Sequence, residues 1–257
     1  MPEIKRGKKL KNSEQPCQAE LADKFVCYQH SVQEPDHEVR VFDQVYRDAF
    51  NTKPLTLRED FCGTFAVSCE WAKSDKNRQA VGLDICPETL DWGIENNLGK
   101  LKAKVAERVE VLEQDVRSRT VPQVDVLAAQ NFSFWCFKTR AEVVNYFKIA
   151  YENLGEKGVM VMDMMGGKEC YASDVTDKRT IIKGKDGFKY HWEQAYFNPV
   201  TADCSFFIHF KFGDGSMIKK VYWDIADEDE DADWQAVDEA PNDDSWLCYV
   251  VGVKQAQ

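Results

Sequence analysis

The sequence predicts an α/β protein: a doubly wound, mostly parallel sheet with helices before its first strand and an antiparallel C-terminal extension. Three observations support this fold class. Between residues 55 and 163, short apolar segments alternate with amphipathic segments of helical length, which is typical of parallel strands joined by right-handed crossovers. Two segments with helical periodicity precede the first strand. Beyond residue 167, apolar and polar residues alternate as in antiparallel strands.

The elements follow in chain order from this periodicity. Two helices come first, over residues 19–32 and 37–50. Strands are then predicted over residues 55–59, 79–83, 109–112, 124–129 and 159–163, and helices over residues 64–73, 87–97 and 140–154. The helix that starts at Pro87 carries its proline in the first turn, where the missing N–H costs nothing.

The C-terminal part is predicted to hold an antiparallel insertion over residues 186–225. Its strands cover residues 188–197, 205–212 and 218–225, with turns at Asn198–Pro199 and Gly213–Gly215. After an acidic loop at residues 227–244, residues 246–253 form a last strand. We interpret residues 55–257 as one domain that includes the insertion and the loop, preceded by a helical segment at residues 19–54 and an arm at residues 1–18.

The composition suits a full-sized core, since 44% of the 257 residues are hydrophobic. The sequence contains no run of about 18 apolar residues that could span a membrane, and the N-terminus lacks the apolar stretch of a signal peptide. The nine cysteines form no CxxC pair, and the four histidines are not at metal-ligand spacing. We therefore expect a cytoplasmic protein with free thiols and no bound metal.

The net charge of −11 comes almost entirely from the acidic loop. Residues 227–244 hold ten carboxylates and no basic residue, so the rest of the chain is nearly neutral. As a calcium loop this stretch lacks the required glycine, because Ala232 takes its place. Basic residues gather only in the arm at residues 1–18, which we interpret as disordered. Binding to nucleic acid needs a basic face, so the sequence argues against a nucleic-acid partner.

Carboxylates follow three successive strands of the predicted sheet. Glu59 closes the first strand, Asp84 follows the second, and Asp115 follows the third. Parallel strands end at one edge of the sheet, where ligands bind at the point of reversed strand order. Placed there, Asp84 can accept hydrogen bonds from both ribose hydroxyls and Asp115 can accept one from the adenine amine. Together the acids predict an adenosine site, although each alone is explained as well by a turn, a helix cap or, for Glu59, an ion pair with Arg58.

Residues 57–64 read LREDFCGT, and the chain resembles the class I S-adenosylmethionine-dependent methyltransferases, most of all a bacterial subgroup with this motif in place of a glycine-rich loop. The resemblance extends to YQHSVQ at residues 28–33, NFS at 131–133, FKTR at 137–140, WEQ at 192–194 and APND at 240–243. It implies a Rossmann-like methyltransferase fold that binds S-adenosylmethionine and releases S-adenosylhomocysteine. The cofactor-binding residues that it implies are Tyr28, Glu59, Gly63, Asp84, Ile85, Asp115, Val116 and Asn131.

The first loop departs from the family pattern of three alternating glycines. Positions 61, 63 and 65 are Phe, Gly and Phe, so we expect the backbone to approach the cofactor closely only around Gly63. The departure also argues against a nicotinamide-dependent oxidoreductase, whose pyrophosphate needs the glycine pattern. A methyltransferase-like binding protein without turnover stays open as a third interpretation.

Methyl transfer from a sulfonium mainly requires alignment and exclusion of water, so the sequence identifies no catalytic base. We expect the acceptor where the fourth and fifth strands end, beside Phe134, Trp135 and Phe137, although each ring is equally well explained as core. The segment NFSF at residues 131–134 lacks the prolines of DNA amino-methyltransferases, which favours a small-molecule acceptor. The helices of residues 19–54 are expected to cover the site as a lid, with Tyr28 over the cofactor.

Overall fold

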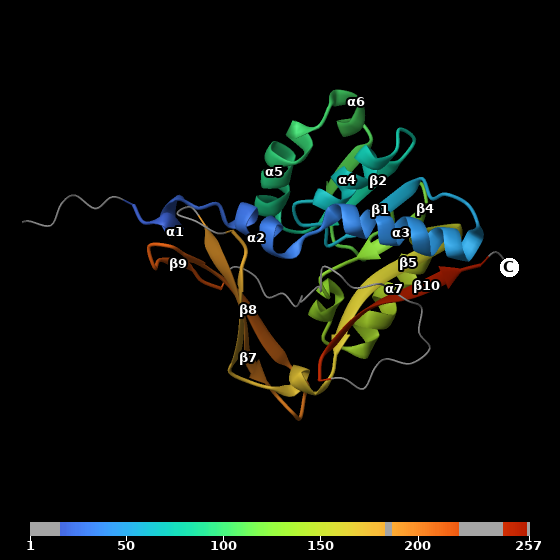
Figure 1. Cartoon of the computed structure of the whole chain (residues 1–257). Coiled ribbons are helices and arrows are strands. Elements are labelled where there is room, and N and C mark those ends of the chain that lie inside the picture. Colours follow the sequence, from blue (N-terminus) through green and yellow to red (C-terminus); the bar gives the residue numbers. More distant parts are fainter. Residues whose placement is uncertain (1–15, 183–186, 221–243, 256–257) are drawn as a thin grey trace, which may run out of the picture.

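The chain forms two sheets in a computed structural model that describes residues 16–182, 187–220 and 244–255. The strands of the larger sheet are β1 (Thr56–Asp60), β2 (Gln79–Asp84), β3 (Val109–Glu113), β4 (Val124–Ala129), β5 (Leu154–Gly166) and β10 (Trp246–Lys254). Their order is β10-β5-β4-β1-β2-β3 (Figure 1). Neighbours from β5 to β3 are parallel, and only β10 runs antiparallel to its neighbour β5. The predicted doubly wound, mostly parallel sheet is confirmed, and its order reverses beside β1.

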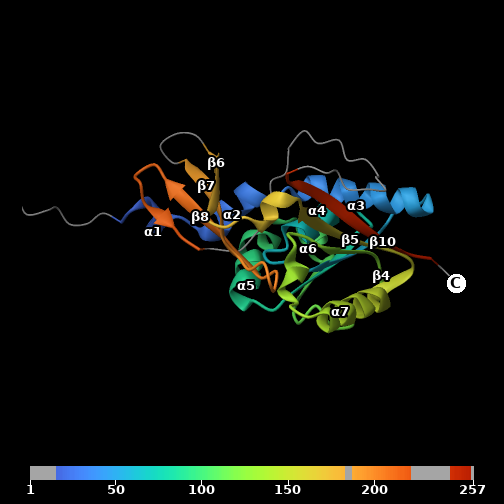
Figure 2. The ribbon, with the colours of Figure 1, turned by 90° about the horizontal axis from the view of Figure 1, so that it is seen from below.

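Helices cover both faces of this sheet (Figure 2). The α-helices of the described residues are α1 (Gln18–Leu21), α2 (Lys24–Val32), α3 (Pro35–Phe50), α4 (Ala66–Ser74), α5 (Pro87–Asn96), α6 (Ala103–Ala106) and α7 (Arg140–Asn153), of which α1 and α2 pack on the second sheet. Helices α3 and α4 bury their apolar sides against β1, β4 and β5, whereas α7 packs on the opposite face. The prediction of one helix over residues 19–32 is wrong: Asp23 accepts from the N–H groups of Phe25 and Val26 and so starts α2 as a separate helix.

The direction of α3 matters for the site. Tyr46, in the C-terminal half of α3, donates a hydrogen bond to the Lys157 carbonyl (3.1 Å) and lies 3.4 Å from a carboxylate oxygen of Asp125. Both partners lie near the amino ends of β5 and β4. Helix α3 therefore runs against the strands, and its N-terminal end lies toward their carboxyl ends.

The second sheet is antiparallel and corresponds to the predicted insertion. Its strands are β6 (Val175–Thr180), β7 (Phe188–Phe197), β8 (Cys204–Phe212) and β9 (Met217–Ile218), in that order. The sequence did not reveal β6, because five of its six residues are exposed and the segment shows no apolar alternation. The predicted arm up to residue 15, most of the strand at 218–225 and nearly all of the acidic loop at 227–244 lie outside the described residues.

The N-terminal helices join the two sheets. Cys27 and Val32 of α2 pack against buried aromatic residues of β7 and β8, and α1 is tied to the turn before β9, where Gln18 and Asp214 bond each other's backbone N–H. On the side of the parallel sheet, the indole N–H of Trp92 in α5 donates to Asp23 (2.6 Å). The predicted helical segment thus bridges the insertion and the parallel sheet.

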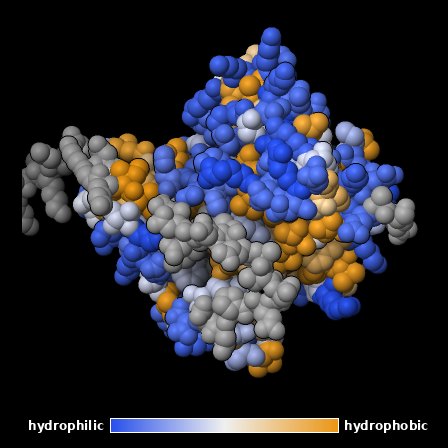
Figure 3. All heavy atoms as spheres, turned by 45° about the vertical axis from the view of Figure 1, so that its right-hand side comes forward, coloured by the Kyte–Doolittle hydropathy of each residue, from blue (hydrophilic) through white to orange (hydrophobic). Residues whose placement is uncertain are grey.

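Exposed hydrophobic residues gather on the side of the molecule that carries the C-terminal strand (Figure 3). Strand β10 forms an edge of the larger sheet among the described strands, and its Val250, Val251 and Val253 are partly exposed. None of the described helices is long and apolar enough to cross a membrane.

Candidate functional site

The loop after β1 keeps one backbone conformation at its three alternating positions. Phe61, Gly63 and Phe65 all have positive φ, at 56°, 52° and 47°. This left-handed region favours glycine and costs other residues about 1–2 kcal/mol each. The loop therefore differs from a three-glycine loop in its side chains and not in its backbone, which is left-handed at all three positions.

The two phenylalanine rings are accommodated on opposite sides of the loop. Phe65 is fully buried, and a Cβ on Gly93 of α5 would lie only 2.5 Å from its ring. The glycine in α5 thus makes room for Phe65. Phe61 lies in the other direction, with its ring 5.9 Å from that of Tyr146 in α7. Core packing on both faces offsets the backbone strain of the loop.

Asp84, at the end of β2, joins the first and second loops. Its carboxylate accepts hydrogen bonds from the backbone N–H of Gly63 (2.9 Å) and of Cys86 (2.9 Å). The capping role considered from the sequence is therefore present. Asp84 itself is half-buried, and Ile85 beside it is 70% exposed, a large apolar side chain facing solvent at the strand ends.

Glu59 is buried below the same loop. One of its oxygens accepts from the backbone N–H (2.8 Å) and the hydroxyl (2.5 Å) of Ser68, in the first turn of α4. Burial raises the pKa of Glu59 to about 7. The ion pair with Arg58 that the sequence left open does not form, because neighbouring side chains of a strand point to opposite faces.

Arg58 instead belongs to a buried network that the sequence analysis missed. Its guanidinium pairs with Asp60 (2.6 Å) and donates to the carbonyls of Val116 (2.6 Å) and Ser118 (2.9 Å). Asp60 also accepts from the Tyr146 hydroxyl (2.9 Å), and burial raises the pKa of Asp60 to about 6. Three consecutive charged residues within one short strand, Arg58, Glu59 and Asp60, were the available signal. The network fixes the loop after β3, which includes the predicted adenine-side residues, to the end of β1.

Asp115 is held by a neighbour that was not predicted. Arg117 donates to both of its oxygens, from Nε at 2.9 Å and from a terminal nitrogen at 2.6 Å. These bonds hold the pKa of Asp115 below its ordinary value. The Arg117 guanidinium also lies 5.1 Å from the ring centre of Phe137. Arg117 thus connects the adenine-side acid with a predicted acceptor-side aromatic residue.

The loop after β4 is anchored by Asp163 of β5. This buried carboxylate accepts from the N–H groups of Asn131 (2.6 Å) and Phe132 (2.8 Å), and both residues have left-handed backbones. Just before them, Gln130 is buried, and neither atom of its side-chain amide has a hydrogen-bond partner in the described part of the chain. Gln130 was not singled out from the sequence.

The predicted acceptor-side aromatics separate into two groups. Phe134 is buried, with its ring 6.2 Å from that of Phe147 in α7, so it belongs to the core. Trp135 and Phe137 are half-buried at the strand ends. The Trp135 ring lies 5.5 Å from that of Phe132.

The first helices reach the site through Gln29 of α2, whose side chain donates to the Thr64 hydroxyl in the first loop (2.8 Å). The neighbouring Tyr28, predicted to lie over the cofactor, packs against the cluster of α2 with β7 and β8. The YQHSVQ segment therefore contacts both the loop and the second sheet.

Comparison with known proteins supports the fold. No protein-family model and no curated sequence matches the chain. Its structure is similar to that of an S-adenosylmethionine-dependent methyltransferase from Clostridium acetobutylicum, with a TM-score of 0.62 and 15% identity over 91% of this chain and 98% of that one. The chain has the class I methyltransferase fold.

Two further structures with this fold are similar at a comparable level. One is the amino pentose methyltransferase CalS10 from Micromonospora echinaspora, with a TM-score of 0.58 and 14% identity over 91% of this chain and 81% of that one. The other is the sugar N-methyltransferase KedS8 from Streptoalloteichus, with a TM-score of 0.57 and 13% identity over 85% and 82%. In this fold the strand ends described above form the ligand-binding edge of the sheet.

Proposed function

We propose that the protein transfers a methyl group from S-adenosylmethionine to a small-molecule acceptor. The observation that carries the proposal is the arrangement around Asp84. Its carboxylate lies at the end of the second strand of a methyltransferase fold, bonded to the left-handed Gly63 and followed by the exposed Ile85. A carboxylate with free lone pairs suits the ribose hydroxyls, and an exposed apolar side chain beside it suits the face of adenine.

We assign the other predicted cofactor residues to the same proposed site. Asp115 and Val116 border the adenine side, where the Arg58 network holds their loop. Glu59 and Asn131, with Gly63, border the methionine side, and Tyr28 belongs to the helix that contacts the first loop. The bound cofactor supplies an activated methyl group on a sulfonium. The protein's task is to hold it in line with the acceptor and to exclude water.

Calorimetry with S-adenosylmethionine, S-adenosylhomocysteine and a reduced nicotinamide dinucleotide tests the proposal against its two alternatives. We expect binding of both adenosyl ligands, no binding of the dinucleotide, and release of S-adenosylhomocysteine with an acceptor. Binding without release under every acceptor would favour a non-catalytic protein, and binding of the dinucleotide alone would favour the oxidoreductase.

The variant Asp84→Ala sharpens this test. We expect it to weaken S-adenosylhomocysteine binding by about 1.5–3 kcal/mol, because two charge-assisted hydrogen bonds to the ribose are lost. Asp91→Ala, which removes an exposed acid from α5, is the matched control and should bind normally. Thermal melting separates loss of affinity from loss of the bonds to Gly63 and Cys86. Unchanged affinity of a folded Asp84→Ala protein would contradict the ribose assignment.

A further inference from the structure

Gln130 is an unusual buried glutamine. Its side chain is 7% exposed, directly after β4, and neither amide atom has a hydrogen-bond partner in the described part of the chain. Burial of an amide without partners destabilises a folded protein. Gln194, buried in β7, shows the ordinary arrangement, since its amide nitrogen donates to three backbone carbonyls. The difference from Gln194 is explained if the Gln130 amide forms its hydrogen bonds only with a bound ligand.

Strand register places Gln130 beside Asp163. Ala129 of β4 pairs with Met162 of β5, so the next residues, Gln130 and Asp163, are neighbours across the two strands. Ala128 belongs to the core that α3 and α4 cover, and side chains two apart on a strand point to the same face. Gln130 therefore points toward the face covered by α3, at the carboxyl edge of the sheet.

Helix α3 brings Glu38 to the same place. Tyr46 lies at the amino edge, where it is bonded to Lys157. Glu38 lies eight residues earlier in the helix, next to the core residue Val39 and about 12 Å nearer the carboxyl edge. Gln130 lies at the end of β4, about 16 Å from the amino-edge residue Asp125. Glu38, which is buried, thus lies over the end of the sheet from which Gln130 points.

The charges at this place have one sign. Among the described residues, the buried charged groups on this face near the carboxyl edge are acidic: Glu38, Glu59 and Asp163. The buried arginines lie elsewhere, Arg58 on the opposite face and Arg78 at the amino edge. Such a site attracts a cation and repels a carboxylate or a phosphate.

We propose that the methyl acceptor is an amine with a nearby oxygen, such as an amino alcohol or amino sugar, bound at a subsite formed by Glu38, Gln130 and Asp163. This inference rests on the proposed function. The Gln130 oxygen accepts from the amine, and its nitrogen donates to the acceptor's oxygen. The protonated amine gives one proton to Glu38. Its lone pair then forms the C–N bond while the C–S bond breaks and leaves its electrons on sulfur, and the product departs as a methylammonium ion.

The first test replaces Gln130 by leucine, which has a similar shape and no amide. If the amide is unpaired until a ligand binds, Gln130→Leu melts at a higher temperature than the wild type without ligand. It binds S-adenosylhomocysteine within twofold of the wild type, and its KM for the amine probe that the wild type methylates, ethanolamine or glucosamine, rises at least tenfold. Gln194→Leu is the matched control and melts at a lower temperature. A lower melting temperature for Gln130→Leu would overturn the proposal.

The second test measures S-adenosylhomocysteine release with matched probes: ethanolamine and glucosamine, their hydroxyl analogues ethylene glycol and glucose, and their carboxylate analogues glycolate and gluconate. We expect turnover of an amine alone, slowed at least tenfold at low amine concentration in Gln130→Leu and lost in Glu38→Gln. Two outcomes would overturn the amine subsite and leave the methyltransferase proposal standing. One is turnover of a hydroxyl or carboxylate probe. The other is a wild type that binds S-adenosylmethionine but methylates neither amine. Failure of the wild type to bind S-adenosylmethionine would overturn both.

Discussion

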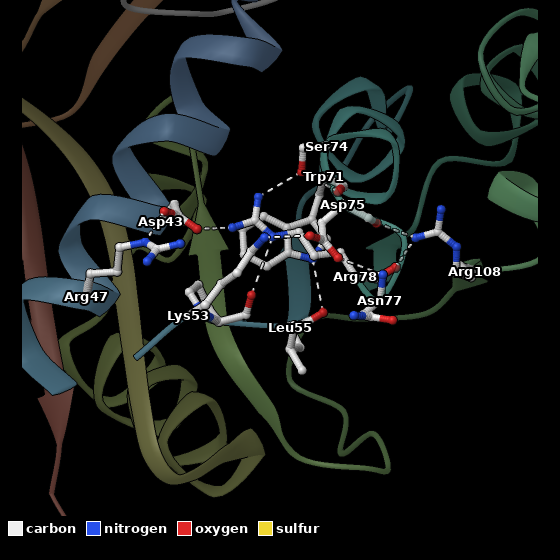
Figure 4. Close-up of polar contacts among 11 residues, drawn as sticks. Asp43, Arg47, Lys53, Leu55, Trp71, Ser74, Asp75, Asn77, Arg78 and Arg108 are labelled. Carbon is white, nitrogen blue, oxygen red and sulfur yellow. Dashed lines mark hydrogen bonds and ion pairs between the residues drawn. The ribbon is translucent and has the colours of Figure 1, made fainter. Parts of the chain in front are cut away.

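The two edges of the larger sheet differ in the hydrogen bonding of two buried polar side chains, Arg78 and Gln130. At the amino edge, the Arg78 guanidinium pairs with Asp43, donates to the Ser74 hydroxyl (2.7 Å) and lies 4.0 Å from the ring centre of Trp71 (Figure 4). At the carboxyl edge, the Gln130 amide has no partner among the described residues. The buried arginine at the amino edge is fully paired, whereas the buried glutamine at the carboxyl edge is unpaired among the described residues.

The neighbours of Arg78 extend this contrast. Asp75 pairs with Lys53 (2.6 Å), and its carbonyl accepts from Arg108 (2.9 Å), so the end of α4 is tied to the starts of the strands. At the carboxyl edge, burial raises the pKa of Glu59 to about 7 and that of Asp60 to about 6. The hydrogen bond from Lys53 holds the pKa of Asp75 below its ordinary value. Burial instead makes the charged forms of Glu59 and Asp60 costly for the protein without a ligand.

The largest effect on stability is expected from removing the Arg78 side chain at the amino edge. Arg78→Ala should lower the free energy of unfolding by about 3–5 kcal/mol, because it removes a buried ion-pair partner, two further hydrogen bonds and the contact with Trp71. Urea denaturation measures this loss. Calorimetry of the folded variant should give unchanged affinity for S-adenosylhomocysteine.

Arg40→Ala is the control for Arg78→Ala. It breaks an ion pair with Asp36 in which both side chains are about two-thirds exposed, so the expected change is below about 0.5 kcal/mol. Equal losses from the two arginines would show that burial of the amino-edge network contributes nothing.

Glu59→Gln tests the opposite behaviour at the carboxyl edge. The folded pKa of about 7 lies above the ordinary value of 4.5, so between these pH values the folded protein holds a proton that the unfolded chain has released. The stability of the wild type therefore falls as pH rises through this window. The glutamine does not titrate, so the variant should gain up to about 3 kcal/mol relative to the wild type at pH 8 and almost nothing at pH 4.

Urea denaturation at pH 4 and pH 8 checks the prediction for Glu59. The titration of Asp60 occurs in both proteins and cancels in the difference. A gain of equal size at both pH values would mean that the carboxylate is not costly at this edge. The variant should also bind S-adenosylmethionine more weakly, since a negative charge near the methionine side is lost.

The contrast also explains how far the sequence could predict the molecule. Periodicity located β4 and β7 with their observed bounds, because a buried strand has a strong apolar pattern. It missed β6, whose residues are mostly exposed, and it joined α1 to α2, because Asp23 acts as a cap within a continuous helical pattern. Local patterns predict elements, whereas their interruption depends on individual hydrogen bonds.

For the site, the sequence placed Asp84 and Asp115 by strand ends but not the groups that hold them. Arg117 and Arg58 act through side-chain geometry that no spacing reveals. Gln130 is conspicuous only once its lack of partners among the described residues is known, since a glutamine after a strand has no pattern of its own. The comparison of the two edges thus needed the structure.

A small loss of stability is expected from Gly63→Ala, which tests whether the first loop is shaped for a ligand. The added Cβ would lie 3.7 Å from its nearest neighbour, a methyl carbon of Thr89, so the protein has room for it. The left-handed backbone costs about 1 kcal/mol. Affinity for S-adenosylhomocysteine should fall much more, at least tenfold, because the side chain occupies space needed by the methionine moiety, and Gly63→Val should abolish binding in a folded protein.

Gly93→Ala gives the matched comparison for this last prediction. There the Cβ would lie 2.5 Å from the Phe65 ring and 2.7 Å from the Thr64 carbonyl, so stability falls by about 1–3 kcal/mol through overpacking. The two glycines thus have different roles. Gly93 makes room for the buried Phe65, and Gly63 leaves space at the strand ends. If a folded Gly63→Val protein bound S-adenosylhomocysteine as tightly as the wild type, the space beside Gly63 would have no part in binding, and the ligand would have to lie elsewhere along this edge.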